Sequence, residues 1–322
     1  MNESQIKESI QCYVGLRPSA KLNIVTDTTE FMRVQAGDVL ELAGKYYLVR
    51  GDEVEGRFGL DGDPKYWVKK AVDLSDGSAK IIKLVFYESF FMQLGEQRIK
   101  CYRSPLKEAR VLEKVRFDPF FMQGFNVEDS AGNSVRIIDR VQGTRFYDLI
   151  NKLDMDHETY FREVLPTIFP EILRSVEAIG RLHALDDVHG DIRNDHILIE
   201  RDTGIYTWID FDYSYDWAEN RFGIDLFGLG NVLLFTIGKG FHHIKDINSC
   251  APPGMRVREC VNADDLSLSF KYRVSNLRKL FPYIPESLNH VLMHFSCGTQ
   301  VFYEHTEELL EDLRLGMRDL GL

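Results

Sequence analysis

The fold is decided by the stretch VHGDIRNDHILIERDTGIYTWIDFD, residues 188 to 212. It begins with the polar tripeptide HGD at 189 to 191, enters an apolar run at 197 to 199, turns at 202 to 204 and returns through 206 to 209. β-Branched and aromatic residues bounded by turn formers are typical of short paired strands. The sequence therefore predicts a β-hairpin here.

Acidic residues stand on both sides of this hairpin, with Asp191 before it and Asp210 and Asp212 after it. A hairpin would bring these carboxylates to one end, where like charges repel unless a cation lies between them. A divalent metal is the simplest such cation. The alternative is a surface hairpin with scattered acids, and Asp202 is a turn residue in either case.

Composition limits the classes of protein to consider. The chain of 322 residues is long enough for one large domain or two lobes, and 44% of it is hydrophobic. A net charge of -11 argues against nucleic acid and anionic membrane as partners, because both require a basic surface. The five cysteines show no CxxC spacing and are odd in number, so they indicate neither a zinc site nor a disulfide framework. We expect a cytoplasmic protein without a leader peptide or membrane span.

The N-terminal third reads as short strands. FMRV, VLEL and KYYLV, within residues 31 to 49, are separated by glycine turns. A segment bearing Gly51, Gly56 and Gly59 follows directly. Glycines at such a place let backbone N–H groups approach phosphate oxygens, although a simple hairpin loop is the alternative.

A lysine and a glutamate are candidate partners in the next segment. The turn at residues 76 to 77 predicts a hairpin, and Lys83 in its second strand shares a face with the apolar Ile81 and Val85. A buried ammonium needs a partner. Glu108 begins the apolar face of the following helix and is that candidate; otherwise both residues are ordinary surface charges.

The chain changes character after Asp139. Two strand-like runs precede this point, and a turn at residues 139 to 144 is the expected lobe boundary. Beyond it the pattern becomes mainly helical. The expected helices cover 145 to 153, 171 to 185, 225 to 235, 285 to 297 and 306 to 320. Asp225 begins the third of these, either as an N-terminal cap or as a buried anchor.

Taken in order, these pieces resemble the protein kinase-like superfamily from about Gly51 to Leu320. The glycine segment, the strand lysine, the helix glutamate, the HGD loop and the pair Asp210-Phe211 follow the order of that family's motifs. The resemblance implies an α+β, bilobal fold. A β-rich, nucleotide-binding N-terminal lobe with one main helix would cover residues 1 to 139, and a mostly helical C-terminal lobe residues 140 to 322.

The resemblance also implies roles in the N-terminal lobe. Gly51, Gly56 and Gly59 would cover ATP, and Lys83, braced by Glu108, would meet the α- and β-phosphates. The linker that begins with Ile138, Asp139 and Arg140 and ends with Val141 would offer backbone groups to adenine, with Ile138 at the gatekeeper position.

In the C-terminal lobe, Asp191 would orient or deprotonate the acceptor hydroxyl, and Arg193 would steady the γ-phosphate. His196, Asp210 and Asp212 would hold the metal, Mg²⁺ or Mn²⁺. His196 stands where the family has asparagine. It either ligates the metal or only packs in the loop, with Asn194 or a water completing the coordination sphere.

Two further departures bear on the substrate. Asp225 follows Asp210 so closely that no room remains for the activation segment on which peptide substrates dock, as in aminoglycoside and other small-molecule phosphotransferases. Gly190 also replaces the arginine that would read a phosphorylated activation loop. The start of the Asp225 helix and the last helices, in contrast, resemble bacterial Ser/Thr kinases of the eukaryotic type.

The resulting expectation is ATP-dependent phosphoryl transfer to a hydroxyl acceptor. A Ser/Thr protein kinase-like enzyme without a full activation segment is the first interpretation. A small-molecule kinase is the alternative, and a non-catalytic nucleotide-binding pseudokinase is the third. The expected partners are a hydroxyl-bearing protein or small molecule, and the oligomeric state is left open.

Overall fold

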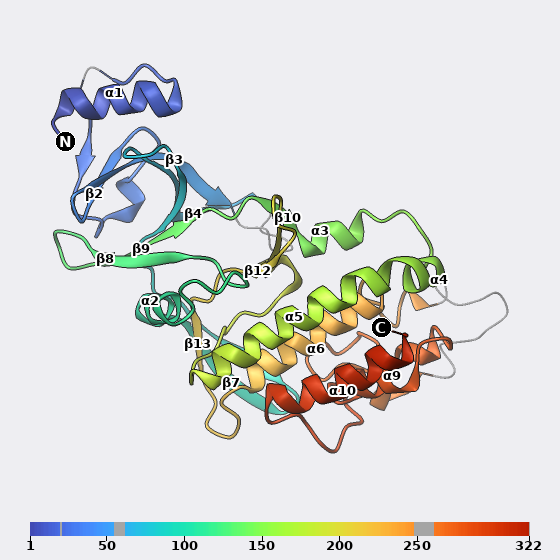
Figure 1. The fold of residues 1–322 in the computed structure, drawn as a ribbon. Helices are drawn as coiled ribbons and strands as arrows, with labels where there is room; N and C mark the ends of the chain where they lie inside the picture. Colours follow the sequence, from blue (N-terminus) through green and yellow to red (C-terminus); the bar gives the residue numbers. More distant parts are fainter. Residues whose placement is uncertain (20, 55–61, 248–260, 322) are drawn as a thin grey trace. The chain divides into compact units, whose positions relative to one another are not determined.

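The computed structural model describes residues 1–19, 21–54, 62–247 and 261–321 (Figure 1). The chain divides into two compact units. The N-terminal unit comprises Met1–Glu88 and Arg103–Val141, and the C-terminal unit comprises Ser89–Tyr102 and Gln142–Leu322. Gly56 and Gly59, two of the predicted nucleotide-binding glycines, lie outside the described residues.

The N-terminal unit is built on a mixed, curled sheet of seven strands in the order β1-β2-β3-β4-β5-β9-β8. All neighbouring pairs are antiparallel except β1 with β2. The strands are β1 (Ile24–Val25), β2 (Val39–Leu42), β3 (Lys45–Val54), β4 (Pro64–Asp73), β5 (Ala79–Lys83), β8 (Gly124–Glu128) and β9 (Ser134–Asp139).

Strand alternation gives this sheet two apolar faces. Leu40, Tyr47 and Ile82 belong to the larger buried cluster, whereas Val39 and Leu48 belong to a second cluster with the helix α1 (Glu3–Val14). Helix α1 begins with a capping box on Asn2 and ends at Gly15, whose φ of 68° is easiest for glycine. Helix α1 thus covers the sheet face that carries Val39 and Leu48 and keeps that face out of water.

One predicted strand is wrong. FMRV forms the 3-10 turn η1 (Phe31–Arg33) instead of a strand. Arg33 N donates to Glu30 O and Val34 N to Phe31 O, so the backbone is satisfied locally, while the Phe31 side chain still packs against the sheet core. Val34 is buried and Met32 is exposed, and the hydrogen bonds of this stretch are those of a turn.

Helix α2 (Pro105–Lys114) is present where the sequence predicts a helix, but it is not the one main helix of the unit, because α1 has 12 residues and α2 has 10. Ser104 caps it by accepting a hydrogen bond from Lys107 N, and Pro105 occupies the first turn. Its buried face includes Glu108, Val111 and Leu112, so the glutamate lies on the inner side of the helix.

The C-terminal unit is mainly helical. Helix α6 is buried on nearly all sides and α5 carries a buried stripe, as their sequences predict. Among residues 142–247 and 261–321, the helices of this unit are α3 (Phe146–Asn151), α4 (His157–Thr159), the π-helical turn η2 (Tyr160–Val164), α5 (Leu165–Ala184), α6 (Gly223–Ile237), α9 (Glu286–Met293) and α10 (Thr306–Asp319). Three 3-10 turns are η3 (Asn194–His196), η4 (Ala263–Asp265) and η5 (Leu277–Lys279). Within the described residues, no helix is both long and apolar enough to cross a membrane.

Two small sheets complete the C-terminal unit. One has the order β10-β11-β12, with β10 (Gly143–Arg145), β11 (Ile197–Glu200) and β12 (Tyr206–Trp208). The other has the order β13-β7-β6, with β13 (Tyr213–Asp216), β7 (Gln97–Arg103) and β6 (Ser89–Leu94).

The second small sheet changes the predicted division of the chain. We expected every residue up to Asp139 in one lobe, whereas the hairpin Ser89–Tyr102 groups with the C-terminal unit and the N-terminal unit runs to Val141. The reason is the pairing of β7 with β13, a strand that the sequence analysis did not predict.

Candidate functional site

The predicted hairpin is present and positions two of the candidate residues. In the β11–β12 register Ile197 is opposite Trp208, so His196 before β11 and Asp210 after β12 emerge at the same end. Ile209 N donates to His196 O at 3.0 Å, which closes that end. Trp208 is buried, and its Nε1 donates to Ser175 O on α5 at 2.9 Å, which anchors the hairpin.

Asp210 adopts a left-handed backbone conformation, with φ of 66°. Such a conformation is uncommon for a residue with a side chain and often occurs at functional sites. The next residue, Phe211, is fully buried, and its ring meets His189 edge-on at 5.8 Å. Burial of Phe211 therefore fixes the chain while the Asp210 carboxylate keeps some exposure.

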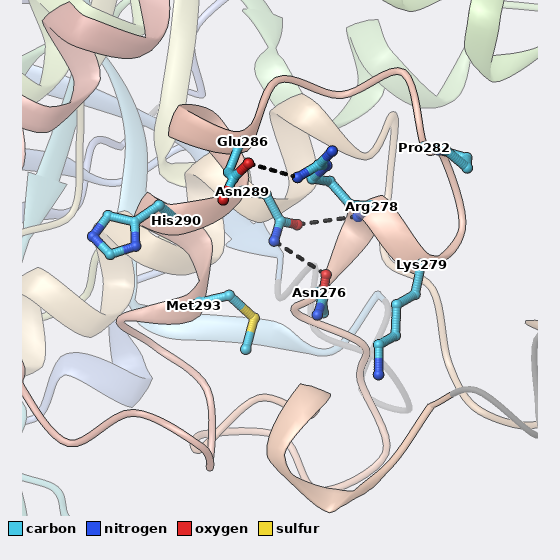
Figure 2. A pocket seen from close by; sticks show the side chains of 8 residues that line it. All are labelled: Asn276, Arg278, Lys279, Pro282, Glu286, Asn289, His290 and Met293. Atoms are coloured by element: carbon cyan, nitrogen blue, oxygen red, sulfur yellow. Dashed lines mark hydrogen bonds and ion pairs between the residues drawn. The ribbon is translucent and has the colours of Figure 1, made fainter.

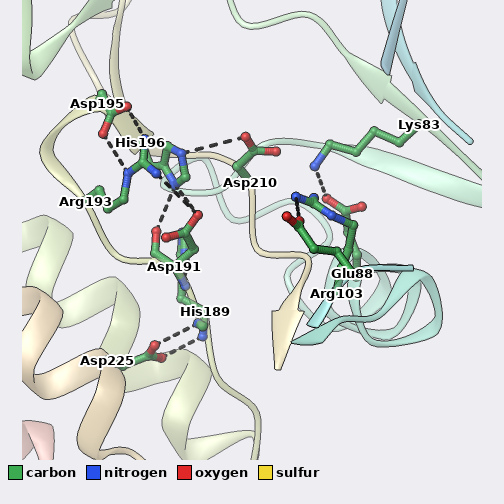
Figure 3. A network of polar contacts seen from close by, with 12 residues as sticks. Lys83, Glu88, Arg103, His189, Asp191, Arg193, Asp195, His196, Asp210 and Asp225 are labelled. Carbon is green, nitrogen blue, oxygen red and sulfur yellow. Dashed lines mark hydrogen bonds and ion pairs between the residues drawn. The ribbon is translucent and has the colours of Figure 1, made fainter. Parts of the chain in front are cut away.

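His196 lies between the acids of the two loops (Figure 3). Its Nδ1 is 2.8 Å from Asp191 O, and a carbonyl can only accept, so Nδ1 carries the proton. In a neutral imidazole Nε2 would then hold the lone pair, and this atom lies 3.8 Å from Asp210 Oδ2. His196 Nδ1 is also 3.6 Å from Asp191 Oδ2.

These residues fit a divalent cation in their chemistry. One carboxylate oxygen of Asp210 lies within 4.8 Å of one of Asp212, and Asp212 is buried. A carbonyl-bound imidazole presenting Nε2 is the usual form of a histidine ligand. The buried Asn194 Oδ1 has no hydrogen-bond partner among the described residues and is a further oxygen of the kind that coordinates Mg²⁺.

Arg193 is engaged by Asp195 in the same loop. Nε donates to Asp195 Oδ1 at 3.0 Å and Nη2 donates to Asp195 Oδ2, while Nη1 is 3.9 Å from Asp191 Oδ2. Burial would raise the pKa of Asp195, but the hydrogen bond from Arg193 and the neighbouring His196 lower it to about 2. This ion pair holds the loop beside Asp191, and the sequence analysis did not anticipate it.

Asp225 is a buried anchor for the HGD loop, which decides between the two predicted roles. It is fully buried near the start of α6 and accepts hydrogen bonds from His189 N at 2.6 Å and Gly190 N at 2.7 Å (Figure 3). His183 Nε2 on α5 adds a third, at 3.0 Å. Burial raises the pKa of Asp225, but the bond from His183 and the backbone donors outweigh it, and the pKa is lowered overall.

Gly190 has a reason to be glycine at this position. Its φ is 83°, in the region that side chains disfavour, and this conformation accompanies the donation of two successive N–H groups to one carboxylate. His183 Nδ1 in turn lies 2.7 Å from Thr306 Oγ1 on α10. The loop is thus connected to three helices through Asp225 and His183.

In the N-terminal unit, the predicted pairing of Lys83 with Glu108 is confirmed. Lys83 Nζ lies 2.6 Å from Glu108 Oε1, and both side chains are buried. Arg136 on β9 is a third member, with Nε 3.1 Å from Glu108 Oε2. The register places Lys83 opposite Arg136, so one carboxylate bridges two neighbouring cations. Arg136 was not predicted as a member of this group, because the sequence of β9 alone does not show which residue of β5 lies opposite it.

A second buried lysine also escaped sequence analysis. Lys69 on β4 is fully buried, and its Nζ lies 2.6 Å from both Val34 O and Asp52 Oδ1. The side chain of Asp52 keeps about a quarter of its exposure. Because Asp52 and Lys69 are opposite each other in the β3–β4 register, this ion pair joins the two strands beside Gly51.

Two of the predicted adenine-binding residues, Ile138 and Asp139, lie in strand β9. Ile138 is buried in β9, and Asp139 N donates to Gln123 O at 2.8 Å. The Asp139 side chain is largely exposed and pairs with Lys80. Val141 ends the unit and is partly exposed. Gly51 lies in β3 with φ of 142°, at an irregularity in the register with β4.

One cavity of about 390 Å³ lies elsewhere in the C-terminal unit (Figure 2). None of the predicted residues lines it. Its charged side chains are paired, since Arg278 Nη1 is 3.3 Å from Glu286 and Lys279 Nζ is 2.6 Å from Asp265. We therefore place the candidate site at the hairpin loops, where carboxylates and a histidine meet, and not at this polar recess.

No family model and no curated protein sequence matches this chain.

Proposed function

We propose that the chain is a phosphotransferase that moves the γ-phosphate of ATP to a hydroxyl group. The observation that carries the proposal is the arrangement of Asp191, His196 and Asp210 at one end of the hairpin. Two carboxylates flank an imidazole whose Nε2 lies 3.8 Å from an oxygen of Asp210. Positioned charges of this kind are the main catalytic device of phosphoryl transfer.

The residues of the C-terminal unit would divide the work. Asp191 would orient or accept the proton of the attacking hydroxyl. His196, Asp210 and Asp212 would hold a divalent cation, which when bound neutralises charge on the transferring group. Arg193 would steady the γ-phosphate. Its guanidinium has five N–H donors, and its bonds to Asp195 use two of them.

The N-terminal unit would bind the nucleotide. Lys83, held by Glu108, would contact the α- and β-phosphates. The second cation on Glu108, Arg136, supports this assignment, because the triad carries more positive than negative charge and so favours an anion nearby. All three side chains are buried, and Lys83 is the one that keeps some side-chain surface, 4%.

The acceptor is proposed as a Ser or Thr hydroxyl of a protein, with a small molecule as the second candidate. A specific observation favours the second candidate. Residues 213 to 216, which follow Asp212, form β13 in a sheet with β7 and β6, so this part of the chain is used within the fold. A peptide-docking segment of the usual kind has no place between Asp210 and α6.

Incubation with γ-labelled ATP and Mg²⁺ or Mn²⁺ tests the proposal, with generic protein acceptors in one arm and a metabolite mixture in the other. Wild-type protein should transfer label, and Asp191→Asn should lower the rate by about three orders of magnitude or more. Asp202→Asn is the matched control, because it makes the same change at an exposed turn of the same hairpin. Its rate should be unchanged.

The destination of the label separates the acceptor classes. Label on protein supports a protein kinase, and label on metabolites supports a small-molecule kinase. Binding of ATP without turnover would instead support the non-catalytic alternative. Absence of ATP binding, measured by calorimetry at millimolar nucleotide, would contradict the proposal as a whole.

A further inference from the structure

A second group of metal-ligating side chains lies on the last two helices, outside the candidate site. His290 is on α9, and His294 is the C-cap residue directly after that helix, one turn beyond His290. Asp312 is on α10. One ligand atom of each residue lies within 4.8 Å of those of the other two. Positions i and i+4 share one face of a helix, so the two imidazoles meet there.

The separation of the two imidazole nitrogens matches that of two ligands on one ion. His290 Nε2 and His294 Nε2 are 3.3 Å apart. Zn–N bonds of 2.0–2.1 Å in tetrahedral geometry place two ligating nitrogens about 3.3 Å from each other. The rings stand nearly perpendicular, at 80°, with their centroids 4.8 Å apart.

Outer partners orient two of the three ligands. His294 Nδ1 lies 2.8 Å from Val301 O, which can only accept, so the proton is on Nδ1 and Nε2 holds a lone pair. Tyr303 donates its hydroxyl to Asp312 Oδ2 at 2.7 Å. A carboxylate accepts about four hydrogen bonds in total, so Asp312 keeps lone pairs for a cation. Such partners are characteristic of protein metal sites.

A hydrogen bond between the two imidazoles is the simpler account of the 3.3 Å contact. In that account His290 donates its Nε2 proton to His294. It does not explain the convergence of a carboxylate from a second helix, or the two outer bonds that hold His294 and Asp312 in place. A metal ion in place of the shared proton explains all three features.

We propose that His290, His294 and Asp312 form a binding site for a divalent transition metal, best suited to Zn²⁺. Two imidazoles and one carboxylate are the ligand types that Zn²⁺ takes and that Mg²⁺ does not prefer. His290 is exposed, so water or another ligand would complete the tetrahedron. His290 also lines the cavity of Figure 2, which lies beside this site. The bound ion would join α9 to α10.

Titration of the chelator-treated full chain with Zn²⁺, followed by calorimetry, tests the site. His290→Gln is the informative variant, because His290 is exposed and its hydrogen-bonding contact is with His294. We expect this variant to lose one equivalent of Zn²⁺, or to bind it at least about 100-fold more weakly, since loss of an outer partner alone costs 10–100-fold. Tyr303→Phe should weaken binding about 10-fold.

Two controls separate this site from others. His243→Gln removes a partly exposed histidine whose Nδ1 is 4.0 Å from Asp246, and it should leave binding unchanged. Asp210→Asn should also leave this equivalent unchanged, so failure of the phosphotransferase proposal does not affect the result. Co²⁺ should give the intense visible absorption of a tetrahedral site in wild type and not in His290→Gln. Equal stoichiometry and affinity in wild type and His290→Gln would overturn the proposal.

Discussion

Replacement of Asp225 by asparagine tests how the HGD loop is held. The carboxylate is fully buried and accepts three hydrogen bonds, two at Oδ2 from His189 N and His183 Nε2 and one at Oδ1 from Gly190 N. An asparagine can place its oxygen at the Oδ2 position. Its NH₂ group then faces Gly190 N–H, a second donor, where the native atoms are 2.7 Å apart.

The expected loss in the free energy of unfolding follows from these two facing donors. Loss of a hydrogen bond to a charged group costs about 1.5–3 kcal/mol, and a buried donor left without a partner costs about 1–3 kcal/mol more. The sum agrees with the roughly 3–5 kcal/mol found when one member of a buried charged network is removed. Water cannot relieve the loss, because Asp225 has no exposed surface. We expect Asp225→Asn to lower the free energy of unfolding by about 4 kcal/mol.

Urea unfolding gives this difference, and amide hydrogen exchange localises it. Exchange of the His189 and Gly190 amides should accelerate more than that of amides in α10. Asp186→Asn is the matched control, since Asp186 makes an ion pair with Arg221 at 2.8 Å but is mostly exposed. It should cost less than about 1 kcal/mol. A loss below about 1 kcal/mol in Asp225→Asn, with unchanged protection of Gly190, would refute the reasoning.

Three further predictions concern ionisable side chains that are wholly or partly buried. Burial lowers the pKa of His157 to about 4. The neutral side chain therefore contributes about 3 kcal/mol to the free energy of unfolding above pH 6.5, and this contribution is lost as the pH falls from about 6.5 to 4. Urea unfolding at pH 7 and pH 4.5 should show a smaller difference for His157→Gln than for wild type. Burial raises the pKa of Asp129, but bonds including that from Asn133 lower it to about 2. Asp129→Asn should therefore cost about 2 kcal/mol at pH 7 and progressively less as the pH falls from about 3.8 to 2. Arg136→Met leaves Glu108 with one cation and should cost about 3 kcal/mol in thermal or urea unfolding.

Each of these predictions has a result that contradicts it. Equal pH dependence of wild type and His157→Gln would mean that folding does not lower the pKa of His157. A constant cost of Asp129→Asn between pH 7 and pH 2.5 would exclude the depressed pKa as its source. If Glu108→Gln restored the stability lost in Arg136→Met, unpaired charge would be confirmed as the cause, whereas additive losses would point to packing alone.

Local sequence patterns were sufficient to predict the hairpin and the helix that carry the candidate residues. The β-branched and aromatic residues of 197 to 208, with the turn formers between them, predict the hairpin, and its register alone brings His196 to Asp210. The apolar face of α2 likewise placed Glu108 inward, where Lys83 meets it. In both cases the signal lies within a short stretch, because side-chain period and turn residues are local properties.

Contacts between distant stretches were decided only by the tertiary structure. Arg136 reaches Glu108 because β9 pairs with β5, and the hairpin 89–102 joins the C-terminal unit because β7 pairs with β13. His290 and His294 form a recognisable i, i+4 pair, but only the packing of α10 against α9 brings Asp312 to them. The sequence by itself thus determined which faces are buried and which loops carry acids. Which charges share a site was determined by strand register and helix packing, since these depend on many weak contacts that no single stretch encodes.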